Sequence, residues 1–257
     1  MALRILITND DGVDAPGIAL MREIAAEISD DVWVVAPDGN QSGAAHRFSF
    51  GHELTLDRRE ERVFAVAGGS PADCVVAGMT NLLVDHPADL VLSGVNAGQN
   101  LGDVINCSGT AAGAREGAMQ GAIAIAMSQA LDYERGRDVV WDNARRYGAA
   151  TVRTILAAAG QGRDTYYNVN FPFCAPDDVR GIQAVSHQRF SRSPFRSYPS
   201  DNEGKFFVAI PETPLPLSPD ADFAKLSRGG VITVTPLSLQ QTDMAALAQL
   251  QDRLTLS

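Results

Sequence analysis

Two adjacent carboxylates, Asp10 and Asp11, follow the apolar run Ile5 to Ile7 after only Thr8 and Asn9. Their mutual repulsion and the loss of hydration both oppose holding two ionised carboxylates at the end of a buried strand. A bound Mg²⁺, Mn²⁺ or Ca²⁺ would remove this cost, because hard divalent cations prefer oxygen ligands. The alternative is an ordinary Asp-Asp-Gly turn, followed by a helix that Asp14 caps. The pair alone therefore indicates either a metal site or a turn.

Two further polar loops carry side chains that could complete a metal shell. Ser42 lies in the loop after the apolar segment 32–36, and Asn96 closes the apolar segment that begins at Asp89. In open parallel sheets, ligands bind outside the carboxyl ends of the strands, so these loops are expected to meet at one edge. Two carboxylates, a hydroxyl and an amide oxygen, completed by water, suit a hard cation. The metal-ligand candidates are Asp10, Asp11, Ser42 and Asn96.

The run Ser108-Gly109-Thr110 leads directly into a predicted helix. Backbone N–H groups at a helix start, together with hydroxyl groups, can bind an anion, although the same three residues also form ordinary N-caps. Beside a cation site, phosphate becomes the favoured ligand. The candidates on the substrate side are Asn9, Asn100, Ser108, Gly109 and Thr110. For Asn9, bracing of the two aspartates is the alternative role.

Buried apolar segments alternate with amphipathic helices through the first 165 residues, which predicts an α/β fold. We expect a Rossmann-like, mostly parallel sheet in residues 1–165, flanked by helices on both faces. Residues 166–257 should complete the fold with strands, an arm at 188–202 and a final amphipathic helix. The predicted strands span 3–8, 32–36, 63–67, 89–96, 122–127, 167–172, 181–186, 205–210 and 231–236. The predicted helices span 16–28, 71–83, 110–120, 138–159 and 242–254.

The charge and the cysteine content of the chain argue against several classes of function. The chain has 257 residues and a formal net charge of −10, so a nucleic-acid polymer would be repelled, whereas a small phosphorylated ligand could bind through a metal. The three cysteines, Cys74, Cys107 and Cys174, are widely separated, which argues against a zinc site and favours a reducing compartment. We see no signal peptide or membrane span and expect a cytoplasmic protein without a membrane partner.

Several common active-site motifs do not occur in this sequence. There is no G-x-G-x-x-G after the first strand, no P-loop and no G-x-S-x-G elbow. A haloacid-dehalogenase-type phosphatase would need an aspartate two positions after its nucleophilic aspartate. Gly12 and Val13 stand at those positions after Asp10 and Asp11, so that pattern is broken.

The ordered set of motifs resembles the SurE family of stationary-phase survival proteins, which are metal-dependent nucleotidases. It keeps the family order from residue 5 to about 237. The matching segments are 7–12 with 15–17, 35–38 with 41–43, 69–75, 93–100, 108–110 with Glu116-Gly117, Asn168-Val169-Asn170-Phe171-Pro172 and 234–237. The ordered set is more specific than any one of its members.

This resemblance implies a Rossmann-like core whose C-terminal extension is exchanged between subunits of a homodimer, in some members within a homotetramer. It implies hydrolysis of nucleoside 5′- and 3′-monophosphates, often with broader phosphomonoester or short-polyphosphate cleavage, and one Mg²⁺ or Mn²⁺ per subunit. The family's metal ligands map onto Asp10, Asp11, Ser42 and Asn96, and its phosphate-side residues onto Asn100, Ser108, Gly109 and Thr110. Asp10 or Asp11 is the candidate general base. His46 is the histidine to test first, against the alternative of an exposed loop residue.

The chain departs from the family pattern just before Ser108. Val104 and Cys107 stand where the family usually has a second acid and an aromatic residue. These changes could alter substrate choice or reduce turnover, and they leave open a non-catalytic nucleotide- or metal-binding module. A sheet-based structural protein is a third interpretation. Arg115 and Glu116, one turn into a helix, are expected to be a solvated or subunit-facing pair.

Overall fold

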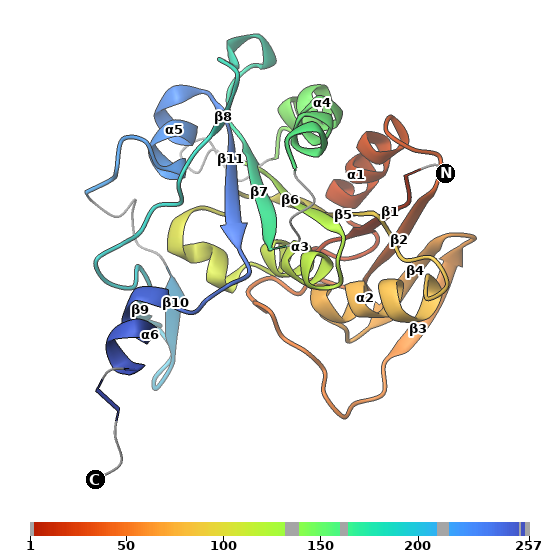
Figure 1. Cartoon of the computed structure of the whole chain (residues 1–257), viewed down its shortest axis with the longest axis horizontal. Coiled ribbons are helices and arrows are strands. Elements are labelled where there is room, and N and C mark those ends of the chain that lie inside the picture. The colour runs from red at the N-terminus through yellow and green to blue at the C-terminus, as the bar shows by residue number, and fades with distance from the viewer. Residues whose placement is uncertain (1–2, 132–138, 160–163, 210–215, 252, 255–257) are drawn as a thin grey trace.

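The computed structural model describes residues 3–131, 139–159, 164–209, 216–251 and 253–254. Its main feature is a nine-stranded sheet with the order β3-β4-β2-β1-β5-β6-β7-β11-β8 (Figure 1). The strands of this sheet are β1 (Ile5–Thr8), β2 (Val32–Pro37), β3 (Thr55–Glu60), β4 (Val63–Ala67), β5 (Leu90–Ala97), β6 (Ile123–Gln129), β7 (Thr165–Phe171), β8 (Ile182–Ala184) and β11 (Ile232–Ser238).

The strands from β4 to β7 in this order are all parallel, which confirms the predicted Rossmann-like sheet. The chain moves outward from β1 through β2 to β4, and then returns past β1 to continue through β5, β6 and β7. The direction of winding therefore reverses between β1 and β5. Ligands of open α/β sheets bind at this switch point, outside the carboxyl ends of the strands. Asp10 and Asn96 lie at the carboxyl ends of these two strands.

Helices cover both faces of the sheet, as predicted (Figure 1). On one face α1 (Pro16–Ala26) and α4 (Asp142–Ala158) pack over Ile5 and Ile7. On the other face α2 (Pro71–Ala77) and α3 (Gly109–Met119) pack over Leu6. Alternate residues of a strand point to opposite faces, so a strand buried on both sides is apolar throughout.

The second half of the chain completes the sheet. Strand β11 pairs antiparallel with β7, and β8 pairs parallel with β11. Four elements were not predicted: β3, whose residues are mostly charged and exposed, the 3₁₀ helices η2 (Gly102–Cys107) and η3 (Pro176–Asp178), and α5 (Asp222–Gly229). The predicted helix 138–159 begins at Asp142, and residues 138, 210 and 252 of the predicted elements lie outside the described residues.

A hairpin and a short helix project from the sheet at the C-terminal end (Figure 1). The hairpin joins β9 (Arg196–Pro199), which lies in the predicted arm 188–202, to β10 (Phe206–Ala209), which lies in the predicted strand 205–210. Phe206 and Phe207 are 67% and 63% exposed. Helix α6 (Met244–Gln251) lies within the predicted helix 242–254, and none of its residues is buried.

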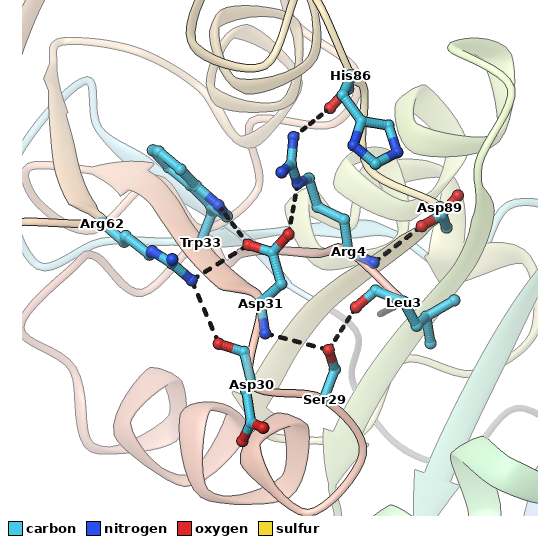
Figure 2. Close-up of polar contacts among 9 residues, drawn as sticks. All are labelled: Leu3, Arg4, Ser29, Asp30, Asp31, Trp33, Arg62, His86 and Asp89. Carbon is cyan, nitrogen blue, oxygen red and sulfur yellow. Dashed lines mark hydrogen bonds and ion pairs between the residues drawn. The ribbon is translucent and has the colours of Figure 1, made fainter. Parts of the chain in front are cut away.

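The amino ends of the central strands are joined by a network of polar contacts (Figure 2). Arg4 donates through Nε to Asp31 Oδ2 at 2.7 Å and through Nη1 to the carbonyl oxygen of His86 at 2.7 Å. Trp33 Nε1 and Arg62 Nη1 also donate to Asp31 Oδ1. Burial raises the pKa of Asp31, but the bonds from Arg4 and Trp33 and the charges of Arg4 and Arg62 outweigh it, so the pKa is lowered. This network lies at the amino ends of the strands, whereas the aspartate pair lies at their carboxyl ends.

Because the pKa of Asp31 is lowered by folding, its carboxylate stabilises the protein above the unfolded pKa of about 4, and this contribution is lost as pH falls. We expect Asp31→Asn to reduce the free energy of unfolding at pH 7 by about 1–2 kcal/mol, or a few degrees in Tm. The matched control is Asp30→Asn, since Asp30 contributes only its main-chain oxygen to the network. Thermal unfolding of Asp31→Asn at pH 7 and pH 3 measures this contribution. An equal loss of stability at both pH values would contradict the role given to the Asp31 carboxylate.

Candidate functional site

The turn after β1 is built by Asn9 and Gly12. The side chain of Asn9 is fully buried, and it donates to the Gly12 carbonyl at 2.9 Å and accepts from the Gly12 N–H at 3.2 Å. Gly12 has a φ of 108°, which favours glycine over residues with a side chain. The side chain of Asn9 therefore braces the turn that carries the two aspartates. Asp14 does not cap α1 either, because the N-cap is Ala15 and has no side-chain cap bond.

Asp10 is the buried member of the acidic pair, with 4% of its surface exposed. Its Oδ1 accepts a hydrogen bond from Thr110 Oγ1 at 2.6 Å, and its main-chain oxygen accepts from the Gln41 N–H at 2.7 Å. Burial raises the pKa of Asp10 to about 6; the bond from Thr110 opposes the shift, and the charge of Asp11 adds to it. Segments after β1, after β2 and at the start of α3 thus converge on this carboxylate.

Asp11 and Asn96 come from the two strands at the switch point. Asp11 Oδ2 accepts from the Ala97 N–H at 3.4 Å, which ties the turn after β1 to the end of β5. Burial raises the pKa of Asp11, although the bond from Ala97 acts in the opposite direction. Asn96 Nδ2 donates to the Gly98 carbonyl at 2.7 Å, and no described residue donates to its Oδ1. The amide oxygen of Asn96 is therefore available as a ligand.

Ser42 lies in the loop after β2. The hydrogen bond from the Gln41 N–H to the Asp10 carbonyl connects this loop to the turn after β1. Its side chain is exposed, and its N–H donates to Asn40 Oδ1 at 2.8 Å, which fixes the local turn. None of the ion pairs found among the described residues includes Asp10 or Asp11. In the same residues there is no cluster of three or more His, Cys, Asp or Glu side chains. Two carboxylates without a basic partner among the described residues fit a hard divalent cation better than zinc, and the loops bonded to them through Gln41 and Ala97 carry Ser42 and Asn96 as further oxygen donors.

The N-terminus of α3 packs directly against Asp10. Ser108 caps the helix by accepting from the Ala111 N–H at 3.0 Å, which leaves its hydroxyl proton free to be donated to a phosphate oxygen. The N–H groups of Gly109 and Thr110 have no acceptor among the described residues. A Cβ on Gly109 would lie 2.7 Å from Asp10 Cβ, which shows how closely the helix approaches the carboxylate. Two free amides beside this site can bind an anion.

A partly buried His46 and a buried Glu116 form a pair, which corrects both expectations for them. His46 Nε2 lies 3.0 Å from Glu116 Oε2, and Gln120 Nε2 donates to Glu116 Oε1 at 2.7 Å. Glu116 is only 3% exposed, so it is not a solvated residue, and His46 is not an exposed loop residue. Glu116 lies seven residues after the start of α3, and the pair joins the loop after β2 to the side of this helix. Sequence alone could not pair two residues 70 positions apart.

The family model described as survival protein SurE matches residues 5–193 of the chain. The chain belongs to the SurE family. It is 43% identical to the 5′-nucleotidase SurE of Methylobacterium radiotolerans, over 96% of this chain and 97% of that protein. It is 40% identical to the 5′-nucleotidase SurE of Brucella canis, with the same coverage. The crystal structure of the SurE protein from Aquifex aeolicus superposes with a TM-score of 0.83 at 31% identity, covering 97% of this chain and all of that one.

All the predicted site residues lie within the segment that the SurE family model matches. The two departures from the family pattern, Val104 and Cys107, lie together in η2, immediately before the cap of α3. The Cys107 carbonyl accepts from the Ala45 N–H at 3.3 Å, so this main chain is held whatever the side chain. Among the described residues, no helix is both long and apolar enough to cross a membrane.

Proposed function

We propose that this chain is a divalent-metal-dependent phosphomonoesterase that hydrolyses nucleoside 5′- and 3′-monophosphates to nucleoside and phosphate. The observation that carries the proposal is the position of Asp10, whose carboxylate makes no ion pair with a described residue and lies beside Asp11 and against the start of α3. A cation site next to an anion site is the arrangement that phosphoryl hydrolysis requires. The relatives named 5′-nucleotidase support the 5′ activity, and the 3′ activity is our extension.

In this proposal Asp10, Asp11, Ser42 and Asn96 hold one Mg²⁺ or Mn²⁺ in each subunit. When bound, the ion neutralises phosphoryl charge and lowers the pKa of a coordinated water. The free N–H groups of Gly109 and Thr110 would bind phosphate oxygens, with Asn100 beside them. Asp10 or Asp11 would accept the proton of the attacking water. His46 is not assigned this role, because its Nε2 lies against Glu116.

We also propose that residues 1–165 form the catalytic core and that residues 166–257 exchange between subunits of a homodimer, alone or within a homotetramer. The exposed apolar residues of β10 and the unburied helix α6 support this, because monomeric proteins seldom leave such elements uncovered. Light scattering on the full chain tests the oligomer. A monomer at micromolar concentration would refute the exchange and leave the phosphatase proposal standing.

The cation should stabilise the fold, because it binds the folded chain only. At a concentration 100 times its Kd, Mn²⁺ should add about 2.7 kcal/mol to the free energy of unfolding. For a chain of this size we expect Tm to rise by about 5–10 °C. Thermal unfolding after EDTA treatment, with Mg²⁺, Mn²⁺ or Ca²⁺ added back, measures this. No shift with any of these ions would contradict the metal site.

Phosphate release from AMP, GMP, 3′-AMP and 4-nitrophenyl phosphate, each with and without the effective ion, tests the reaction itself. The non-catalytic alternative rests on Val104 and Cys107, which replace an acid and an aromatic residue of the family pattern. It predicts a metal-induced rise in Tm and nucleotide binding without release. A structural protein would show neither effect. A cytoplasmic location is consistent with the reaction proposed.

A further inference from the structure

Two buried asparagines of β7, Asn168 and Asn170, bind the main chain of Asn100. They are two residues apart, so both side chains leave the sheet on the same face. Asn170 accepts from the Asn100 N–H at 2.9 Å and donates to the Asn100 carbonyl at 3.0 Å. Asn168 Nδ2 donates to the same carbonyl at 2.8 Å. One strand thus satisfies both backbone groups of a residue 68–70 positions away.

The side chain of Asn100 continues this set of hydrogen bonds toward Asp10. Its Nδ2 donates to Ser128 Oγ at 3.0 Å and approaches Thr110 Oγ1 at 3.4 Å. Thr110 has one hydroxyl proton, which it donates to Asp10 Oδ1 at 2.6 Å, so toward Asn100 it can only accept. A continuous chain of hydrogen bonds therefore runs from β7 through Asn100 and Thr110 to the buried carboxylate.

We infer that Asn168 and Asn170 are positioning residues, which fix Asn100 beside the phosphate site and, through Thr110, fix the orientation of Asp10. The inference rests on the proposed function, since Asn100 and Asp10 belong to its site. Buried amides in a strand interior are unfavourable unless they make hydrogen bonds, and the Oδ1 of Asn168 has no partner among the described residues, so Val or Ile would pack there more simply. Their bonds to Asn100 account for the Asn-x-Asn pattern, which the catalytic residues by themselves leave unexplained.

The test uses near-isosteric leucine variants of the full chain. Asn170→Leu removes two bonds to Asn100, and Asn168→Leu removes one, so kcat/KM should fall about 10- to 100-fold for the first and less for the second. Asn168→Leu also serves if Asn170→Leu does not fold. The matched control is Thr233→Val, which lies opposite Asn170 on β11, is fully buried, and has a hydroxyl without a partner among the described residues. The control should stay within about twofold of the parent chain.

A double-mutant cycle separates positioning from general stability. If Asn168 acts through the Asn100 side chain, Asn168→Leu should change kcat/KM less than about twofold in an Asn100→Ala background. It should also raise the Mn²⁺ concentration that gives the half-maximal rise in Tm, which Thr233→Val should not do. Additive effects on kcat/KM, or an unchanged Mn²⁺ requirement, would overturn the inference. If the parent chain releases no phosphate, the proposed function fails, and the Mn²⁺ titration alone decides the positioning role.

Discussion

Asp10→Asn should abolish phosphate release and at the same time stabilise the metal-free protein. Losing a carboxylate ligand forfeits several kcal/mol of transition-state stabilisation, so kcat should fall by about 10³-fold or more at saturating metal. Folding raises the pKa of Asp10 from 3.8 to about 6, so the folded state favours the protonated acid. The metal-free protein therefore loses stability as pH rises through this interval. Asparagine removes that loss, while its oxygen can still accept from Thr110.

At pH 8 the gain should be about 3 kcal/mol, or several degrees in the Tm of EDTA-treated protein, and it should vanish below pH 4. The control is Asp14→Asn, since Asp14 is exposed and lies four positions further on. It should change neither kcat nor Tm. Opposite signs in activity and stability distinguish a metal ligand from a merely structural aspartate, whose loss would lower both. If Asp10→Asn retains phosphate release, this metal site is refuted.

The central sheet was predictable because its strands are buried on both faces. Such strands are continuous apolar runs, and β1, β2, β4 and β5 all match predicted segments within one or two residues. Elements without that signal were missed. β3 reads Thr55-Leu56-Asp57-Arg58-Arg59-Glu60 and lies at the sheet edge, where it gains its strand geometry from pairing with β4 and not from burial. α6 was predicted as a helix, but the periodicity could not show that none of its residues would be buried against the described part of the chain.

For the site, sequence could place residues at strand ends but could not assign their contacts. The switch point brings Asp10, Asp11 and Asn96 to the carboxyl ends of two neighbouring parallel strands, where the sequence analysis expected their loops to meet. The partners of Asn9, His46 and Glu116 depend on turns and on residues far apart in the chain. The Asn-x-Asn pattern of β7 was visible as a motif, but its role appears only when Asn100 is seen beside it. Such contacts depend on tertiary geometry, which periodicity does not encode.

Gly109→Ala tests how closely α3 must approach Asp10. The new Cβ would lie 2.7 Å from Asp10 Cβ and 3.0 Å from both Cγ and Oδ2, closer than ordinary van der Waals contact. Either the carboxylate or the start of the helix must shift by several tenths of an ångström. Because displacements approaching 1 Å in an active site can cost about 10²-fold in rate, we expect kcat to fall 10- to 100-fold. Alanine is a good helix former, so the helix itself should not be weakened.

Gly39→Ala is the matched control, because Gly39 lies in the neighbouring loop and a Cβ there meets nothing within 4 Å. It should leave kcat within about twofold. The metal requirement distinguishes two ways in which Gly109→Ala could act. If the methyl group displaces Asp10, the half-maximal Mn²⁺ concentration for activity should rise with the loss in kcat. If it only obstructs the α3 amides, KM for AMP should rise and the Mn²⁺ requirement should not change. An unaltered enzyme would mean that the contact between α3 and Asp10 is looser in solution than this structure requires.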